Sequence, residues 1–205
     1  MPSNPHAKIV ALGGGHGLAV ALQAVRRYAQ SVTAVVSVAD DGGSSGRLRR
    51  DLGVAAPGDL RKSLVALAAD TGPWPAAFEH RFAGGELSGH ALGNLLIVGL
   101  AASLGDLNRA LDEAGRLLGA VGRVVPATVD AVTLEADIGD EAVIGQVAVE
   151  SLAAGVVVNQ VRVVPADAAA TPDALDAIAD ATQVVLAPGS LYTSVLAVLC
   201  VPEIR

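Results

Sequence analysis

The strongest constraint on the fold is a strand, a glycine turn and a helix near the start of the chain. Lys8 to Leu12 is a short apolar segment followed by the glycines of GGGHG (13–17), and a helix is expected from about Gly17 to Tyr28. The β-branched segment Val32 to Val38 completes a β-α-β unit. Because such crossovers are right-handed and join parallel strands, this unit predicts an α/β fold with a mostly parallel sheet.

Turn and capping residues divide the rest of the chain into further elements. They predict a helix opened by Pro57-Gly58-Asp59, capped by Asp59 and running to about Ala69; an irregular segment from Thr71 to Glu86; a largely buried helix from Leu87 to Leu104; a helix capped by Asp106 that ends near Gly119; a helix starting at Thr171-Pro172-Asp173; a buried strand from Gln183 to Ala187; and a final helix opened by Pro188 to Ser194. Strands, some of them antiparallel, are expected at 124–125, 132–136, 143–149 and 156–164.

These elements predict a Rossmann-like three-layer α/β fold, with a mostly parallel sheet and a small antiparallel β extension. We expect one nucleotide-binding domain over residues 1–205, in which residues 122–165 are a candidate β subdomain. A doubly wound sheet normally closes with further β-α units after the position where this chain stops, so we expect a C-terminal truncation at Arg205.

The segment Ala39 to Arg49, ADDGGSSGRLR, is the most polar part of the chain and is predicted to be a loop. It follows a predicted strand and combines two adjacent carboxylates with glycines, serines and arginines. Adjacent acids are costly to bury unless a partner satisfies them, and a ligand with hydroxyls or phosphates would do so. A solvated turn is the alternative interpretation.

The glycine turn GGGHG indicates a phosphate site, because its backbone N–H groups can approach an anion at the positive end of a helix. Its match to the dinucleotide fingerprint is imperfect, since Leu18 replaces the last glycine, although Asp40 lies where a ribose-binding acid is expected. A nucleotide site is favoured over a nicotinamide dehydrogenase. A turn that needs its glycines only for packing is the alternative.

Four segments share this design: GGGHG, ADDGGSSGRLR, PGDLR (57–61) and PGSLYTS (188–194), with Gly89 to Asn94 bordering them. Carboxyl ends of parallel strands line one edge of a sheet, so we expect these segments to converge on one crevice. The predicted ligand-binding residues are Gly13, Gly14, Gly15, His16, Gly17, Asp40, Asp41, Gly42, Gly43, Ser44, Ser45, Arg47, Gly58, Asp59, Arg61, His90, Asn94, Gly189, Ser190, Tyr192 and Thr193.

The chemistry of these side chains suggests their roles. Arg47 and Arg61 supply charge for phosphate, while the hydroxyls of Ser44, Ser45, Ser190 and Thr193 can donate to its oxygens. Asp40 and Asp41 supply acceptors for hydroxyls or for a Mg²⁺-bound water, and are the candidate catalytic residues if there is catalysis. His16 is expected to contact the ligand. His90 is expected to be a hydrogen-bonding residue at a helix start, with catalysis as the alternative.

Composition excludes several classes of protein. A net charge of -7 argues against a nucleic-acid partner. The single cysteine, Cys200, excludes an internal disulfide framework and fits a reducing cytosol. The start MPSNPHAK has no signal-peptide pattern, and the uncharged runs are interrupted by glycine or proline, so we expect a cytoplasmic protein without membrane contact.

Six motifs in order resemble the CofD-like family, in particular its gluconeogenesis-factor branch: GGGHG, VADDGGSSGRLR, PGDLR, SGHALGNLL, GRVVPATVD and APGSLYTSVL. The resemblance implies a cytoplasmic bacterial regulator of cell shape and envelope synthesis during gluconeogenic growth, leaning away from catalysis. It implies a nucleotide-sugar ligand such as UDP-N-acetylglucosamine. Protein partners in envelope synthesis and a homo-oligomer are two further expectations for this chain.

The other branch of the family contains 2-phospho-L-lactate transferase, which implies an alternative function. That enzyme passes a phospholactyl group from a guanine nucleotide to a deazaflavin acceptor with Mg²⁺. Two departures from the gluconeogenesis-factor branch stand out. This chain has His16 where the branch often has threonine, and members of the branch usually continue beyond this length.

Overall fold

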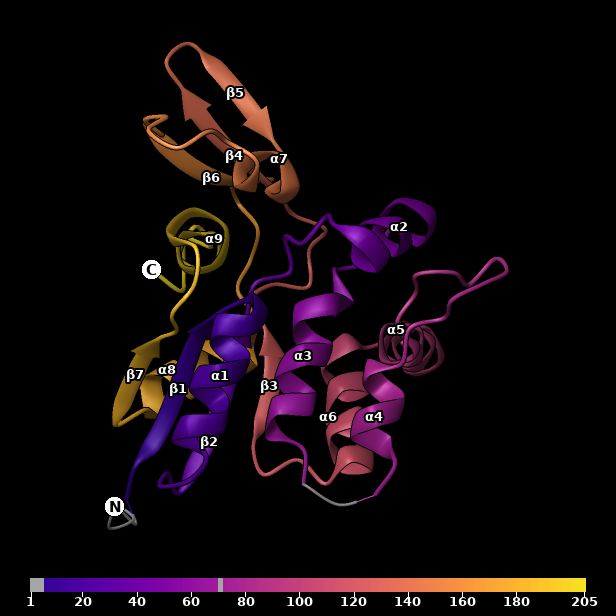
Figure 1. Cartoon of the computed structure of the whole chain (residues 1–205). Coiled ribbons are helices and arrows are strands. Elements are labelled where there is room, and N and C mark those ends of the chain that lie inside the picture. Colours follow the sequence, from indigo (N-terminus) through magenta and orange to yellow (C-terminus); the bar gives the residue numbers. More distant parts are fainter. Residues whose placement is uncertain (1–5, 70–71) are drawn as a thin grey trace.

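The computed structural model describes residues 6–69 and 72–205. Within these residues a parallel sheet forms the centre of the fold (Figure 1), and its strand order is β3-β2-β1-β7. Its strands are β1 (Lys8–Gly13), β2 (Ser31–Val36), β3 (Arg123–Pro126) and β7 (Gln183–Leu186). The predicted α/β class with a parallel sheet is therefore confirmed.

The register of the sheet brings the carboxyl ends of its strands to one edge. Gly13 of β1 pairs with Val36 of β2, which pairs with Pro126 of β3. On the other side of β1, Leu12 pairs with Leu186 of β7. The loops that leave these strands therefore start side by side, which is the arrangement that places ligand sites in open α/β sheets.

Helices cover both faces of the parallel sheet and give three layers. On one face α1 (Gly15–Val25), α3 (Pro57–Leu67) and α6 (Leu107–Leu118) pack against alternate sheet residues such as Ala11 and Ala34. On the other face α8 (Pro172–Asp180) and α9 (Ala197–Leu199) pack against Val10 and Val35. The other described helices are α2 (Gly43–Leu52), α4 (Trp74–Glu79), α5 (Leu92–Leu104), α7 (Gln146–Glu150) and the π-helical turn η1 (Leu191–Leu196).

The predicted antiparallel extension is also confirmed, and it lies beyond the carboxyl edge of the parallel sheet (Figure 1). Its strands β4 (Thr133–Ile138), β5 (Glu141–Ile144) and β6 (Gln160–Val164) have the order β5-β4-β6. The extension is narrower than residues 122–165, because β3 joins the parallel sheet instead. The predicted strand 143–149 is wrong: it breaks at Gly145, whose φ of 99° suits glycine, and continues as α7.

Two helices occupy segments that were predicted to be irregular. In the predicted polar loop, α2 buries Ser44, Ser45, Gly46 and Leu48, and Gly53 ends it in the left-handed conformation. Apolar periodicity does not predict this helix, because only one of its buried residues is a large apolar one. Helix α4 carries a proline in its first turn, where the missing N–H has no helical partner to lose. The predicted irregular segment began at Thr71, which lies outside the described residues.

Other predicted boundaries and environments differ as well. Helix α1 starts two residues before the expected Gly17 and ends at Val25 rather than Tyr28. Helix α5 starts at Leu92 rather than Leu87 and is only partly buried, through Gly93, Asn94 and Ile97.

The last strand was predicted to be buried, but β7 is a sheet edge with Leu186 53% exposed. By contrast, Asp106 and Thr171 cap α6 and α8 as predicted. None of the described helices is long and apolar enough to span a membrane.

Candidate functional site

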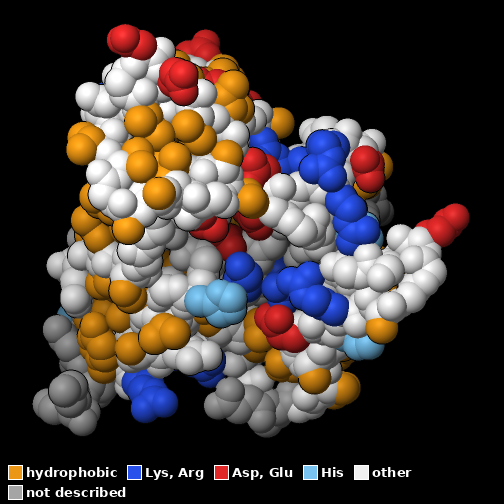
Figure 2. Space-filling model, turned by 45° about the horizontal axis from the view of Figure 1, so that its top comes forward, with side chains coloured by type: hydrophobic (Ala, Val, Ile, Leu, Met, Phe, Trp, Pro, Cys, Tyr) orange, Lys and Arg blue, Asp and Glu red, His pale blue; other side chains and the backbone are white. Residues whose placement is uncertain are grey.

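A cleft of about 350 Å³ lies at the carboxyl edge of the parallel sheet. Figure 2 shows it as a hollow with acidic side chains at its base and histidine and basic side chains along one rim. Loops after β1, β2 and β7 line it together with α3 and α7. Its lining residues are Gly14, Gly15, His16, Gly17, Asp40, Gly42, Asp59, Lys62, Gln146, Val147, Glu150, Gly189, Ser190 and Ser194.

Asp59 connects two of the predicted segments at the centre of the cleft. It was predicted to cap its own helix, which is wrong, because α3 begins after Ala56 without a side-chain cap. The Asp59 Oδ2 atom instead accepts a hydrogen bond of 2.7 Å from the backbone N–H of Gly15, in the first turn of α1. Its Oδ1 atom lies 2.9 Å from Nζ of Lys62. A carboxylate thus occupies the positive end of α1, where anions are stabilised.

The adjacent acids Asp40 and Asp41 point to different places. Asp40 lines the cleft, and its Oδ1 atom accepts a hydrogen bond of 2.9 Å from the N–H of Gly42. Burial raises the pKa of Asp40, and the nearby negative charge of Asp59 raises it further. Asp41 turns away: its Oδ1 atom accepts a hydrogen bond of 3.0 Å from the N–H of Val147 at the start of α7.

Three glycines in and next to this cleft lie close to other atoms, and for Gly17 the close atom belongs to the backbone. A Cβ atom on Gly17 would lie 1.6 Å from the carbonyl oxygen of Pro188, which is impossible without moving the backbone. A Cβ on Gly58 would lie 2.3 Å from Ser45 Oγ and 2.8 Å from Asp40 Oδ2, and one on Gly14 would lie 2.7 Å from Asp59 Oδ2. Glycines of the turn are therefore needed for packing, as in the alternative interpretation, and Gly14 and Gly17 do this in the wall of the cleft.

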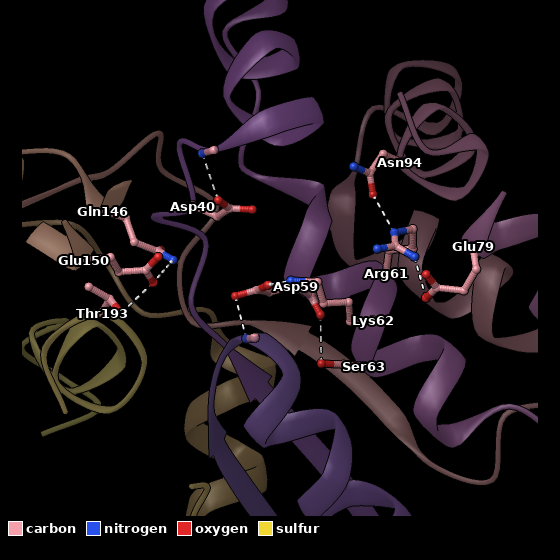
Figure 3. Close-up of polar contacts among 12 residues, drawn as sticks. Asp40, Asp59, Arg61, Lys62, Ser63, Glu79, Asn94, Gln146, Glu150 and Thr193 are labelled. Carbon is pink, nitrogen blue, oxygen red and sulfur yellow. Dashed lines mark hydrogen bonds and ion pairs between the residues drawn. The ribbon is translucent and has the colours of Figure 1, made fainter. Parts of the chain in front are cut away.

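Four further predicted residues form a buried network behind the cleft: Arg61, Asn94, Ser44 and His90. Arg61 Nε donates to Asn94 Oδ1 at 3.0 Å, Asn94 Nδ2 donates to Ser44 Oγ at 3.0 Å, and Ser44 Oγ lies 3.0 Å from His90 Nδ1. Arg61 Nη1 also lies 2.5 Å from Glu79 Oε1 (Figure 3). The four side chains do not line the cleft.

The protonation state of His90 follows from this network. Burial lowers the pKa of His90, and the positive charge of Arg47 lowers it further. A neutral imidazole accepts at one nitrogen, and Ser44 already receives a hydrogen from Asn94, so its own hydroxyl hydrogen is free for His90 Nδ1. His90 thus makes a buried hydrogen bond just before α5, the first of its two predicted roles.

The remaining predicted residues take structural positions around the cleft. Arg47 Nη2 donates to the carbonyl of Ser88 at 2.7 Å. Thr193 is buried and donates to Glu150 Oε1 at 2.9 Å. Ser45 is buried and hydrogen-bonded to Asp40. Gly13 ends β1, Gly43 begins α2 and Tyr192 packs against the core.

Five lining residues were not predicted: Lys62, Gln146, Val147, Glu150 and Ser194. Lys62 could have been found, because it lies three residues after Asp59 on a predicted helix and therefore shares its face. Gln146 and Val147 could not, because they fall in the segment 143–149 that was predicted to be a strand, and Glu150 follows that segment directly.

A second groove, of about 550 Å³, continues from the cleft across His16 and Lys62. Its charged lining residues include Arg61, Glu79 and Arg81 as well as Lys62, so it is more basic than the cleft. As for metal ions, the described parts of the chain contain no group of three or more His, Cys, Asp or Glu side chains placed to hold one.

Comparison with known proteins agrees with the sequence resemblance. Residues 9–205 match the family described as 2-phospho-L-lactate transferase CofD. The gluconeogenesis factor of Bacillus subtilis is 40% identical over 96% of this chain and 62% of its own length. A Mycobacterium leprae protein, whose name likewise refers to gluconeogenesis factors, is 51% identical over 98% of this chain and 58% of its own length.

A solved structure has the same fold. The crystal structure of a UPF0052 family member from Bacillus halodurans superposes with a TM-score of 0.90 at 42% sequence identity, over 96% of this chain and 63% of that chain. The present chain therefore spans about three fifths of the length of the relatives it matches. By sequence and by fold, the chain belongs to the CofD family and is similar to its members that are named gluconeogenesis factor.

Proposed function

We propose that this chain binds a nucleotide sugar of the UDP-N-acetylglucosamine type in the cleft and acts as a regulator in cell-envelope synthesis and cell shape. The observation that carries the proposal is that the start of α1 and the Lys62 ammonium both border the cleft. Asp59 occupies the N–H of Gly15, but the N–H groups of His16 and Gly17 in the same first turn have no partner within the helix and can donate to phosphate oxygens.

The diphosphate has several donors within the cleft. Backbone N–H groups of the glycine turn, the Lys62 ammonium and the Ser190 hydroxyl all border it. Lys62 takes the role that the sequence suggested for Arg47 and Arg61, since those guanidinium groups are engaged elsewhere. Asp40, in the loop after β2, is the acceptor for ribose hydroxyls.

The test is calorimetric titration of the chain with UDP-N-acetylglucosamine, UDP-glucose and UDP. We expect saturable binding that weakens by about threefold to tenfold in His16→Ala, because each lost polar contact contributes about 0.5–1.5 kcal/mol. His80→Ala is the matched control: His80 lies outside the cleft, and its replacement should leave the affinity unchanged. Absence of heat with every nucleotide would defeat the proposal.

A transferase activity is the second candidate, favoured by the two carboxylates of the cleft. Asp40 and Asp59 are close enough for the charge of one to raise the pKa of the other, and a divalent cation would relieve that repulsion. Mg²⁺ is usually held by one or two protein carboxylates, with water and ligand phosphates completing its shell. This pair fits such an ion, which would neutralise charge on the transferred phosphoryl group.

Incubation with a deazaflavin acceptor, Mg²⁺ and a phospholactyl guanine nucleotide tests this candidate. Product that disappears in Asp40→Asn would support transfer. No product from the wild-type chain, under conditions where it binds nucleotide, would exclude the activity and leave the binding proposal intact.

A further inference from the structure

The α7 wall, which we define as Gln146, Val147 and Glu150, forms a side of the cleft that no sequence motif predicted. It comes from the antiparallel extension, yet it faces Asp59 and Lys62 across the cleft (Figure 3). Three separate hydrogen bonds hold it in place, and two of its side-chain oxygen atoms can still accept a hydrogen bond. Both features indicate that it recognises part of a ligand.

The wall is anchored to three other elements. Gly145, just before α7, donates its N–H to the carbonyl of Leu134 in β4 at 2.7 Å. The carboxylate of Asp41, in the loop after β2, accepts from the N–H of Val147. Thr193 in η1 donates to Glu150 Oε1. Because three hydrogen bonds to other segments hold this five-residue helix, its side chains are presented in a defined geometry.

The orientation of Gln146 is determined by its neighbour. Its amide nitrogen must face Glu150 Oε1, at 3.1 Å, because a carboxylate only accepts hydrogen bonds. The Gln146 Oε1 atom is then buried and receives no hydrogen bond from any residue in 6–69 or 72–205. A buried acceptor without a donor costs about 1–3 kcal/mol, which a ligand donor would recover.

Glu150 adds a second acceptor. Within residues 6–69 and 72–205, the hydrogen bonds from Thr193 and Gln146 both reach Oε1. The side chain is exposed, so Oε2 is available to a ligand. The wall therefore offers an amide oxygen and a carboxylate oxygen. Such a pair selects a group that donates two hydrogen bonds, which vicinal hydroxyls do and a phosphate does not.

The position of the wall distinguishes the two sugars of the ligand. The diphosphate lies at the end of β1 in the proposed function, and Asp40 receives the ribose on the β2 side. The wall meets η1, which follows β7 on the opposite side of β1. The group beyond the second phosphate therefore reaches the wall.

We propose that Gln146 and Glu150 recognise the hexose hydroxyls of the nucleotide sugar, and that Asp41 is the positioning residue that holds α7 for this task. This inference rests on the proposed function, because it needs a nucleotide sugar in the cleft. It gives the antiparallel extension a role in selecting the sugar.

The experiment compares the dissociation constants of UDP and UDP-N-acetylglucosamine. In the wild-type chain we expect the sugar to tighten binding by about tenfold, corresponding to two hydrogen bonds. In Gln146→Met and Glu150→Gln this preference should fall to about twofold, while UDP weakens by no more than about twofold. Gln160→Met changes an exposed glutamine in β6 and should keep the full preference.

The positioning role of Asp41 has its own readout. Asp41→Ala should lose the preference for the hexose, and Asp41→Asn should retain it, because the amide oxygen can still accept from the N–H of Val147.

The outcomes separate the two proposals. If the affinities for UDP and UDP-N-acetylglucosamine fall by the same factor in the wall variants, the preference persists and the wall does not recognise the hexose. A wild-type chain that binds both nucleotides equally also overturns the inference and leaves nucleotide binding standing. A wild-type chain that binds neither refutes the proposed function and this inference with it.

Discussion

The cleft and the buried network are built from neighbouring residues of the same motifs, yet they have opposite environments. Arg61 and Lys62 are adjacent on α3, but the Arg61 side chain is 2% exposed in the network while that of Lys62 is 23% exposed at the cleft. Consecutive residues of a helix point about 100° apart, so one can be buried and the other can meet a ligand. Asp40 and Asp41 are also adjacent and face different ways: Asp40 lines the cleft, whereas the carboxylate of Asp41 accepts from the N–H of Val147.

The comparison teaches that a dense polar motif performs two tasks. One set of its side chains faces the place where a ligand can enter, and the other joins α2, α3 and α5 through buried hydrogen bonds. Substitutions in the network should therefore change stability, while substitutions in the cleft should change binding.

The largest expected effect is on the network. Arg61→Ala removes the ion pair to Glu79 and leaves Asn94 Oδ1 without its donor in a buried site. We expect the free energy of unfolding to fall by about 2–4 kcal/mol, equivalent to roughly 5–15 °C in Tm. Denaturant unfolding measures this free energy. The control is Arg116→Ala, which breaks an exposed i,i+3 ion pair and should lower the free energy of unfolding by less than about 0.5 kcal/mol. A loss in Arg61→Ala as small as in the control would contradict the structural role of the network.

The next largest effect is expected in the cleft, on nucleotide affinity. Lys62→Ala should weaken nucleotide binding by about tenfold through loss of a charged hydrogen bond to phosphate. Stability should fall by less than in Arg61→Ala, because Lys62 is itself 23% exposed and the buried Asp59 carboxylate keeps its hydrogen bond from Gly15. Calorimetry and thermal unfolding on the same protein provide both numbers. Equal affinity in the variant and the wild type would remove Lys62 from the proposed site.

The smallest effect concerns Asp40. Its pKa is raised in the folded state, so the folded protein binds more protons than the unfolded chain between the ordinary and the raised pKa, and stability falls as pH rises through that window. Asp40→Asn should therefore stabilise the chain at neutral pH by the order of 0.5 kcal/mol, and the gain should disappear at acidic pH. Thermal unfolding across pH measures this, and a gain independent of pH would contradict it.

The difference between Asp40 and Asp41 marks the limit of sequence reasoning at the site. Both follow β2 and were equivalent as candidates, and only the placement of α7 decides that Asp41 meets Val147. Helical spacing could have identified Lys62, whereas Gln146 fell in the segment 143–149 that was predicted to be a strand, and Glu150 follows that segment directly. The helix α2 was missed because its buried face consists of serine, glycine and a single leucine.

The sequence by itself determined the β-α-β unit, the parallel sheet, the caps at Asp106 and Thr171 and the family, because these depend on local periodicity and on motif order. The tertiary structure alone decided which polar side chains face the cleft and which are buried behind it. That division depends on contacts between distant residues, such as Asp41 and Val147, which are 106 positions apart, and no local pattern encodes where such segments meet.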